Sequence, residues 1–197
     1  VGLFRGPDWA QADPVTRDAV ESAAATLQPL VASLAEVEPG AGFTDIAGHH
    51  RTIAGYEFAR SISWERTERG QQLSPKLLHG RCQDGIQTSY EAFANAQAAL
   101  LLQRAMHDEL MQHYDLLLTP SAPGEAWPGL LATGDPVFNT AWTAVHTPTL
   151  SVPAFRGVTG LPVGLQLVGR FRADRELLAA AAAVCEALGI GTVPPVG

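Results

Sequence analysis

Histidine, serine and cysteine side chains are the residues of this sequence whose types and spacing could support catalysis. Cys82 follows His79 by three positions, a spacing that would let an imidazole activate a thiolate. Ser61 and Ser63 stand beside Arg60 in a helical pattern, where a hydroxyl without a neighbouring base is not a nucleophile. The G-x-S-x-G turn of serine hydrolases does not occur. We therefore predict no catalytic residue in this sequence and keep Cys82 as an alternative nucleophile.

Metal and cofactor sites are not predicted either. His49 and His50 are adjacent, so on a helix their side chains diverge by about 100° and do not easily share a metal ion. Glu109 and His113 have the i,i+4 spacing of a helical ligand pair, but no HExxH motif or cysteine pair supplies a third ligand. The glycines between 157 and 169 form neither a G-x-G-x-x-G fingerprint nor a phosphate-binding loop. We expect no metal and no cofactor.

The composition limits the class of partner. The formal net charge is −7 and Lys76 is the only lysine, which disfavours nucleic acid because phosphate binding needs clustered basic side chains. No apolar run reaches the roughly 18 residues of a membrane span. Cys82 and Cys185 form no C-x-x-C pair, so we expect reduced thiols in a cytoplasmic protein. These features disfavour nucleic acid and membrane as partners, and they do not decide whether the protein forms a homo-oligomer.

The first third of the sequence predicts a parallel crossover unit. Residues 1–5 are predicted as a strand, 14–28 as a helix with Asp13 as its N-cap, and 32–37 as a second strand. Strand, helix and strand in this order and length are typical of two parallel strands joined by a helix. Because an apolar strand begins at Val1, which is not a methionine, we expect the chain to start within a longer protein.

The rest of the sequence predicts helices and a strand pair. These elements are helical segments at 44–72, 86–113 and 137–146, strands at 114–120, 149–153 and 161–169, and a helix from Asp174 as N-cap to Gly189. The two strands on either side of the glycine-flanked turn are close enough to form an antiparallel hairpin. We therefore predict an α/β fold with a mixed β-sheet covered by helices.

Two stretches of the sequence resemble the amidase signature family. "YDLLLTPSAPGEAW" and "GDPVFNTAWTAVHTPTLSVPAFRGVTGLPVGLQLVGRFRADRELL" contain, in order, an apolar strand leading to Thr-Pro, a Ser-x-Pro strand, the run Gly-Leu-Pro-Val-Gly-Leu-Gln and a helix led by Asp. The resemblance is specific from Tyr114 to Leu188, consistent from Val1 to Val37, and limited to helical character between 43 and 113. It implies that residues 1–197 are the C-terminal portion of a single amidase-like domain.

The resemblance also implies a chemistry. That family hydrolyses amide bonds with a lysine, a serine after a cis peptide and a nucleophilic serine on a Gly/Ser-rich loop, all in its N-terminal half. Here no Gly-Gly or Ser-Ser doublet occurs, and Lys76 lies in the wrong segment to match the catalytic lysine. The implied function is a hydrolase of small-molecule amides whose reactive residues lie on the missing N-terminal half of the same protein. Alone, this chain would be inactive.

The resemblance assigns the candidate substrate contacts. In the family, the segment before the motif proline approaches the scissile bond, which makes Asn139, Trp142, Thr143 and His146 the candidate substrate-binding residues. His146 stands where most relatives have a glycine, so its side chain would narrow the neighbouring pocket. The alternative for Trp142, together with Phe138, is an ordinary core aromatic.

Two other functions remain open at this stage. A truncated relative of an amidase would be a non-catalytic scaffold or binding module that docks a partner through an open sheet edge. A thiol enzyme that uses Cys82 is the third possibility, and its activity would be lost in Cys82→Ser.

Overall fold

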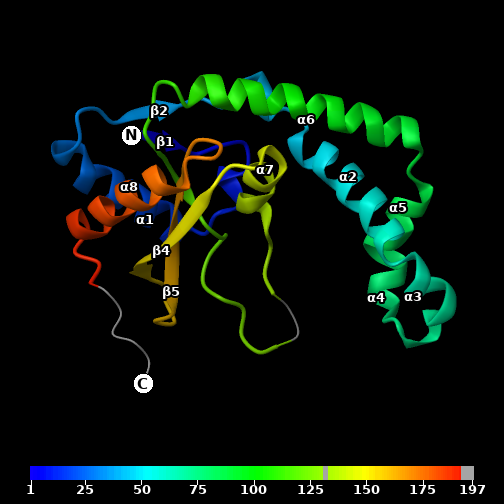
Figure 1. Cartoon of the computed structure of the whole chain (residues 1–197). Coiled ribbons are helices and arrows are strands. Elements are labelled where there is room, and N and C mark those ends of the chain that lie inside the picture. Colours follow the sequence, from blue (N-terminus) through cyan, green and yellow to red (C-terminus); the bar gives the residue numbers. More distant parts are fainter. Residues whose placement is uncertain (131–132, 192–197) are drawn as a thin grey trace.

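A five-stranded mixed sheet forms the centre of the protein (Figure 1). The computed structural model describes residues 1–130 and 133–191. β1 (Gly2–Phe4) lies between β2 (Ala35–Val37) and β3 (Leu117–Pro120) and runs parallel to both. β5 (Pro162–Val168) is antiparallel to β3 on one side and to β4 (Thr149–Arg156) on the other. The strand order β2-β1-β3-β5-β4 confirms the predicted mixed α/β fold.

One face of the sheet is covered by α1 (Pro14–Leu27) and α8 (Asp174–Ala187). Alternate strand residues turn toward these helices because successive side chains of a strand point to opposite faces. The apolar stripes of the two helices meet them in one core, whose buried members include Leu3, Val20, Ala23, Leu27, Leu118, Leu165, Leu167, Leu177 and Ala181. The apolar residues whose spacing predicted these two helices are therefore the ones that pack against the sheet.

The opposite face is only partly covered. α7 (Val137–Val145), α6 (Tyr90–Leu110) and the start of α2 (Ile46–Ser61) pack over β1, β3 and the end of β5. Their shared core contains Phe4, Ile46, Leu100, Leu117, Trp142, Val145 and Val168. On β4, by contrast, Thr149, Ser151 and Pro153 are exposed on this face. Among the described residues, no helix lies over that part of the sheet.

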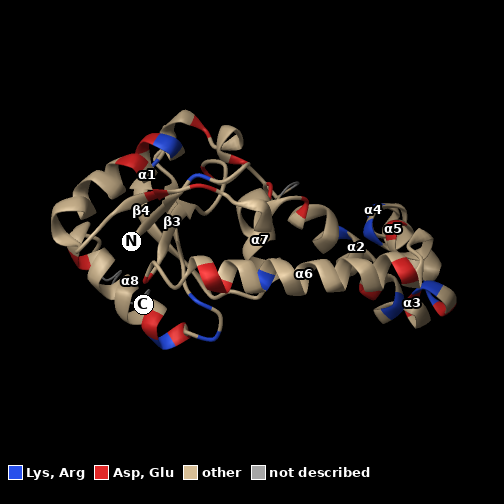
Figure 2. Ribbon diagram, turned by 90° about the horizontal axis from the view of Figure 1, so that it is seen from above, with Lys and Arg blue, Asp and Glu red and all other residues tan. Residues whose placement is uncertain are grey.

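A helical arm, residues 46–110, projects from the sheet (Figures 1 and 2). α2 leads away from the sheet and α6 returns beside it, and α3 (Ser63–Glu68), α4 (Pro75–Leu77) and α5 (Gln83–Gln87) close the far end, where basic and acidic positions both occur. A Cβ at Gly85 would overlap the carbonyl oxygen of Gly55, so α2 and α5 cross backbone to backbone. Shorter helical turns lie at Trp9–Gln11, Gln28–Leu30, Ala41–Phe43, Gly70–Gln72 and Leu78–Cys82.

Several predicted boundaries were wrong for local reasons. The long helix begins at Tyr90 rather than at 86, because the Ser89 hydroxyl accepts a hydrogen bond from the Ala92 N–H at 3.1 Å and caps it. Helix α8 begins at Asp174 itself, with Ala173 at the N-cap position after the left-handed Arg172. Asp174 is therefore not the N-cap residue. It lies in the first turn, where its negative charge interacts favourably with the positive end of the helix dipole.

Two further differences concern the cap of α1 and the length of β4. Asp13 does occupy the N-cap position of α1, but its side chain makes no capping hydrogen bond. β4 continues past Pro153 to Arg156, with an irregular register between Val152 and Phe155. β4 is an edge strand, and an edge strand tolerates proline at a position where an N–H would point to solvent rather than to a neighbouring strand.

None of the helices in the described part of the chain has the length and apolar character that crossing a membrane requires.

Candidate functional site

The carboxyl ends of β1 and β3 meet at one edge of the sheet, and α7 begins beside them. α/β proteins commonly bind their ligands at this edge. The Asp135 carboxylate accepts a hydrogen bond from the Val137 N–H at 3.0 Å, which satisfies one free donor at the start of α7. The four predicted contact residues all lie on α7 or at its end, so the direction of this helix decides what each one faces.

Asn139 connects α7 to two strands. Its amide nitrogen donates to the carbonyl oxygen of Ser121 at 3.0 Å, and its Oδ1 accepts from Nε2 of Gln166 at 2.7 Å. Gln166 is 2% exposed, and its Oε1 has no partner among the described residues. A buried amide is stable only when it is hydrogen-bonded, so this chain of contacts fixes the orientation of Asn139.

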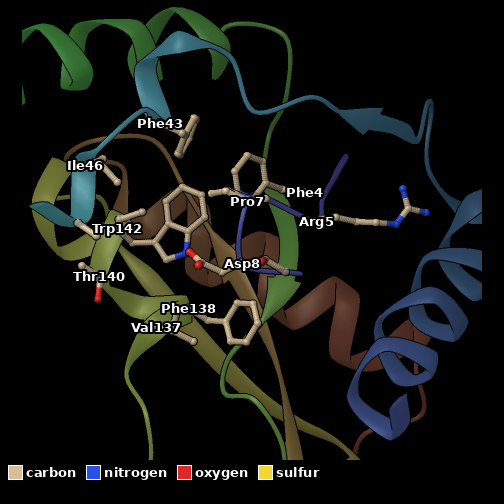
Figure 3. A pocket seen from close by; sticks show the side chains of 14 residues that line it. Phe4, Arg5, Pro7, Asp8, Phe43, Ile46, Val137, Phe138, Thr140 and Trp142 are labelled. Atoms are coloured by element: carbon tan, nitrogen blue, oxygen red, sulfur yellow. The ribbon is translucent and has the colours of Figure 1, made fainter. Parts of the chain in front are cut away.

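Trp142 lies in an aromatic cluster beneath the sheet edge (Figure 3). Its ring centre is 5.2 Å from that of Phe4 and 5.7 Å from that of Phe43, in edge-on arrangements. Trp142 is 3% exposed and Phe138 is 6% exposed. Both are core aromatics, and they also line a hollow of about 100 Å³ together with Phe4 and Asp8. Arg5 points away from this hollow toward α1, where it pairs with Glu21.

A groove between α2 and α7 contains the other predicted residues. It consists of two hollows of about 490 Å³ and about 520 Å³ that share His50, Ala54 and Thr143. We call it the α2–α7 groove. Its first hollow is lined by Glu57, Arg104 and His146 among others, and its second by Arg51, Arg81, Asp84 and Asn139 among others. Three of the four predicted contacts, Asn139, Thr143 and His146, therefore line one groove.

Arg104 on α6 joins the first hollow to the end of α7. Its Nε donates to the carbonyl oxygen of Val145 at 3.0 Å, and its Nη2 lies 2.9 Å from Nδ1 of His146. A cation at the C-terminus of a helix is stabilising because it meets the negative end of the helix dipole. Desolvation, and then the charge of Arg104, lower the pKa of His146, while Glu57 acts in the opposite direction.

The backbone of His146 has the conformation that glycine adopts most readily. Its φ is 60° and its ψ is 33°, in the left-handed region that favours glycine. His146 follows the last residue of α7 and turns the chain toward β4, and its side chain is exposed at the groove. The side chain thus replaces the open space that a glycine would leave.

A third hollow, of about 960 Å³, lies over the uncovered part of the sheet. It is lined by the loop after β3 and by exposed residues of β4 and β5, including Ser151, Pro153 and Pro162. A side chain at Gly164 would overlap the hydroxyls of Ser121 and Ser151, so the glycine leaves room for a hydroxyl from the loop after β3 and one from β4.

Glu125 closes one wall of this third hollow. Its carboxylate accepts hydrogen bonds from the Thr159 N–H at 3.0 Å, the Thr159 hydroxyl at 2.9 Å and the Leu161 N–H at 2.8 Å. Desolvation acts to raise the pKa of Glu125, but these bonds and one from Gly160 lower it below its usual value. A side chain at Gly157 would overlap the Glu125 side chain. We call this set of contacts the Glu125 clasp.

The other chemistry-bearing residues do not assemble into a site. Cys82 is completely buried and His79 is exposed. A cysteine nucleophile requires instead an accessible thiol next to a basic side chain. In residues 1–130 and 133–191, no group of three or more histidine, cysteine or acidic side chains is placed to hold a metal ion. Sequence reasoning missed Arg104, Gln166 and Glu125, of which Gln166 and Glu125 lay within the stretches that resemble the family, whereas Arg104 lay outside them.

Comparison with known proteins gives a consistent family assignment. The Amidase family model matches residues 1–178. The chain is 31% identical over 196 residues to a glutamyl-tRNA(Gln) amidotransferase subunit of Cenarchaeum symbiosum (strain A), covering 94% of this chain and 40% of that protein. It is 34% identical over 155 residues to the corresponding protein of Methylorubrum extorquens (strain PA1), covering 73% and 30%. The chain thus spans 40% or less of the length of these relatives.

Solved structures share the fold at lower identity. A crystal structure of an amidase superposes with a TM-score of 0.82 at 23% identity, covering 94% of this chain and 44% of the other. Fatty acid amide hydrolase gives a TM-score of 0.76 at 18% identity, with 96% and 40% covered. The substrate complex of 6-aminohexanoate cyclic dimer hydrolase gives 0.75 at 20% identity, with 95% and 44% covered.

Proposed function

This chain belongs to the amidase family, and from that membership we propose that it forms the C-terminal portion of an enzyme that hydrolyses carbon–nitrogen amide bonds of small molecules. The observation that carries the proposal is the family match over residues 1–178, because that range includes every strand of the sheet and α7. The resemblance inferred from the motifs is confirmed by the same match.

In this proposal residues 1–197 are one part of a single amidase domain, and the preceding polypeptide carries the lysine and the two serines of the reaction. A lysine that relays a proton through one serine would activate the other as nucleophile, and backbone N–H groups would hold the oxyanion. Two features of the sheet support it. β4 pairs only with β5 among the described strands, and Ser151 and Pro153 remain exposed. Further strands would pair with the β4 edge, and further helices would cover the exposed face.

The α2–α7 groove is the proposed substrate site. Asn139, Thr143 and His146 would contact the substrate from α7, and His50 faces them from α2. Trp142 would support the wall of the site from the core, since it is buried beneath the same helix. Cys82 and Cys185 are unpaired, which favours a reducing, cytoplasmic compartment.

An ammonia-release assay on small amides tests the proposal. It compares this chain alone with the same chain joined to the preceding polypeptide, and we expect activity only in the longer protein. An amide-directed covalent inhibitor should label a serine outside residues 1–197, which peptide mass spectrometry locates. Ammonia release by the chain alone, or a labelled residue within it, contradicts the proposal.

A second candidate is a role as one component of an amidotransferase. The identity of 31% over 94% of the chain to a protein with that name favours it. In that role the protein would act with other subunits on glutamyl-tRNA(Gln), as the name of the relative states. Ammonia release from small amides by the purified protein supports the first candidate. Activity that requires partner subunits and glutamyl-tRNA(Gln) supports the second.

A further inference from the structure

The contact between Arg104 and His146 determines which ring nitrogen of the histidine carries its proton. Nη2 of Arg104 is 2.9 Å from Nδ1 of His146. A guanidinium group only donates hydrogen bonds and stays charged at every pH at which proteins are folded. Nδ1 must therefore be the acceptor. In a neutral imidazole one nitrogen accepts and the other donates, which leaves the proton on Nε2.

We propose that Arg104 is a positioning residue that fixes His146 as the neutral Nε2–H tautomer, so that His146 presents a hydrogen-bond donor to an acceptor oxygen of a ligand in the α2–α7 groove. The identity of that ligand as an amide substrate rests on the proposed function. The tautomer itself does not, because it follows from the contact between the Arg104 and His146 side chains.

Both partners of the contact are held in place. The Arg104 guanidinium is fixed by its bond to the Val145 carbonyl oxygen at 3.0 Å, and its central carbon lies 5.3 Å from the ring centre of Phe171. His146 starts from a left-handed backbone that fixes the direction of its Cβ. The two residues are 42 positions apart, on α6 and at the end of α7. The tautomer thus depends on the packing of α6 against α7.

The charges around the ring keep it neutral. Arg104 faces it from α6, and Glu57 and His50 line the same hollow from α2. Among the described residues, no carboxylate lies within 4.0 Å of a His146 nitrogen, whereas His49 has such a neighbour in Asp45. Desolvation and Arg104 lower the pKa of His146 more than Glu57 raises it. Protonation at Nδ1 would also bring two donors face to face.

These features define the chemical class of the ligand group. An N–H donor at the groove binds a carbonyl or carboxylate oxygen, and a neutral ring does not require the ligand to be an anion. A protonated amine finds no acceptor at this point, since the Nδ1 lone pair is already used. His146 would therefore select the oxygen side of an amide rather than a free amine.

Nitrogen NMR of the histidine rings tests the tautomer directly. In uniformly ¹⁵N-labelled protein we expect the pattern of a protonated Nε2 for His146, with a titration midpoint below 6.5, the ordinary value. Arg104→Met frees Nδ1 and removes the nearby charge, so the midpoint should rise and both tautomers should appear. Arg175→Met, at an exposed position of α8, is the matched control and should change neither signal. An Nδ1–H pattern in the parent protein, or an unchanged pattern in Arg104→Met, overturns the proposal.

Two substitutions of His146 test the donor role in the active, longer protein. Gln places an amide N–H at about the distance of Nε2 from the backbone, whereas Met has a similar length and no N–H donor, and both keep the Cβ at the left-handed position. We expect kcat/KM on a small amide to be kept within about 3-fold in His146→Gln and to fall by about 10-fold in His146→Met, the loss of one hydrogen bond. Equal losses in the two variants overturn the donor role. Absence of any amidase activity instead contradicts the proposed function and leaves the NMR result standing.

Discussion

Nε2 of Gln166 donates a hydrogen bond to Oδ1 of Asn139 at 2.7 Å, which joins the middle of β5 to the first turn of α7. Asn139 in turn donates to the Ser121 carbonyl oxygen, just after β3. The helix that carries the predicted substrate contacts is thus held by a polar bridge to two strands as well as by its apolar face. Because Gln166 is buried, water cannot readily replace Asn139 as the hydrogen-bond partner of its amide.

Removing one end of this bridge should cost more stability than removing both. In Asn139→Ala the buried amide of Gln166 loses its acceptor, and we expect the free energy of unfolding to fall by about 1–3 kcal/mol. Adding Gln166→Leu should recover part of the loss, because the buried amide that Asn139→Ala leaves unpaired is then removed as well. Urea denaturation measures both values, with Thr140→Ala on the same helix as control. A double variant with fully additive losses would contradict the coupling.

The left-handed backbone of His146 predicts that glycine is better tolerated there than alanine. At a φ of 60° a Cβ is strained by about 1–2 kcal/mol, and His146→Ala keeps that strain. We expect His146→Gly to be more stable than His146→Ala by about 1 kcal/mol in thermal and urea unfolding. Both variants lose the contact with Arg104, so their difference isolates the backbone. Equal stabilities would show that residue 146 is not left-handed in solution.

The buried His107 predicts a pH dependence of stability. Its ring lies 5.7 Å from that of Trp142, and neither nitrogen makes a hydrogen bond of good geometry with the described residues. Burial lowers its pKa below 6.5, more than the charge of Asp108 and a weak contact with the Gly169 backbone raise it. Such a group stabilises the fold above the unfolded-state pKa, and this contribution is lost as the pH falls below about 6.5 toward the lower folded-state pKa. His107→Phe should reduce the fall in unfolding free energy between pH 7 and 5.

The exposed His113 provides the control for this measurement. His113→Phe changes the same residue type at the end of the same helical region and should leave the pH dependence as it was. At pH 7 we expect His107→Phe to be at least as stable as the parent, since two unpaired buried nitrogens are removed. A steeper pH dependence in His107→Phe would contradict a neutral, buried histidine.

The Glu125 clasp predicts slow amide exchange at the turn between β4 and β5. In the parent protein the N–H groups of Thr159 and Leu161 should be protected, and Glu125→Gln should increase their exchange rates. Glu38→Gln, at an exposed loop position, is the control. Because the pKa of Glu125 is lowered, the clasp should persist down to about pH 4.5 and open as the pH falls through the lower value. Exchange at the turn that is insensitive to both changes would exclude the clasp.

The elements of the sheet layer could be predicted from the sequence because local signals agreed. The apolar spacing of α1 and α8, the proline at the end of β3 and the left-handed Gly189 after α8 each placed a boundary to within a few residues. The arm was less predictable. The spacing of apolar residues does not show a break between α5 and α6. The structure shows one, because α5 ends at Gln87 and Ser89 caps the start of α6.

The candidate site could be predicted only as far as one contiguous motif extends. Asn139, Thr143 and His146 lie in that motif, and the structure brings them to one groove, although their contact with a substrate stays a prediction. Arg104 and Glu125 act on partners 42 and 34 positions away. Their roles depend on how α6 packs on α7 and how a loop meets a hairpin turn, and no spacing along the chain encodes either.

The backbone crossing of Gly55 and Gly85 has a mechanical consequence for the arm. Because no side chain separates the two backbones at this crossing, α2 and α5 have no room to move closer together. α2 is also one wall of the groove, which it lines with His50 and with Ala54, the residue next to Gly55. A bulky residue at position 55 or 85 would push α2 and α5 apart and so change the width of the groove, although neither position lines it.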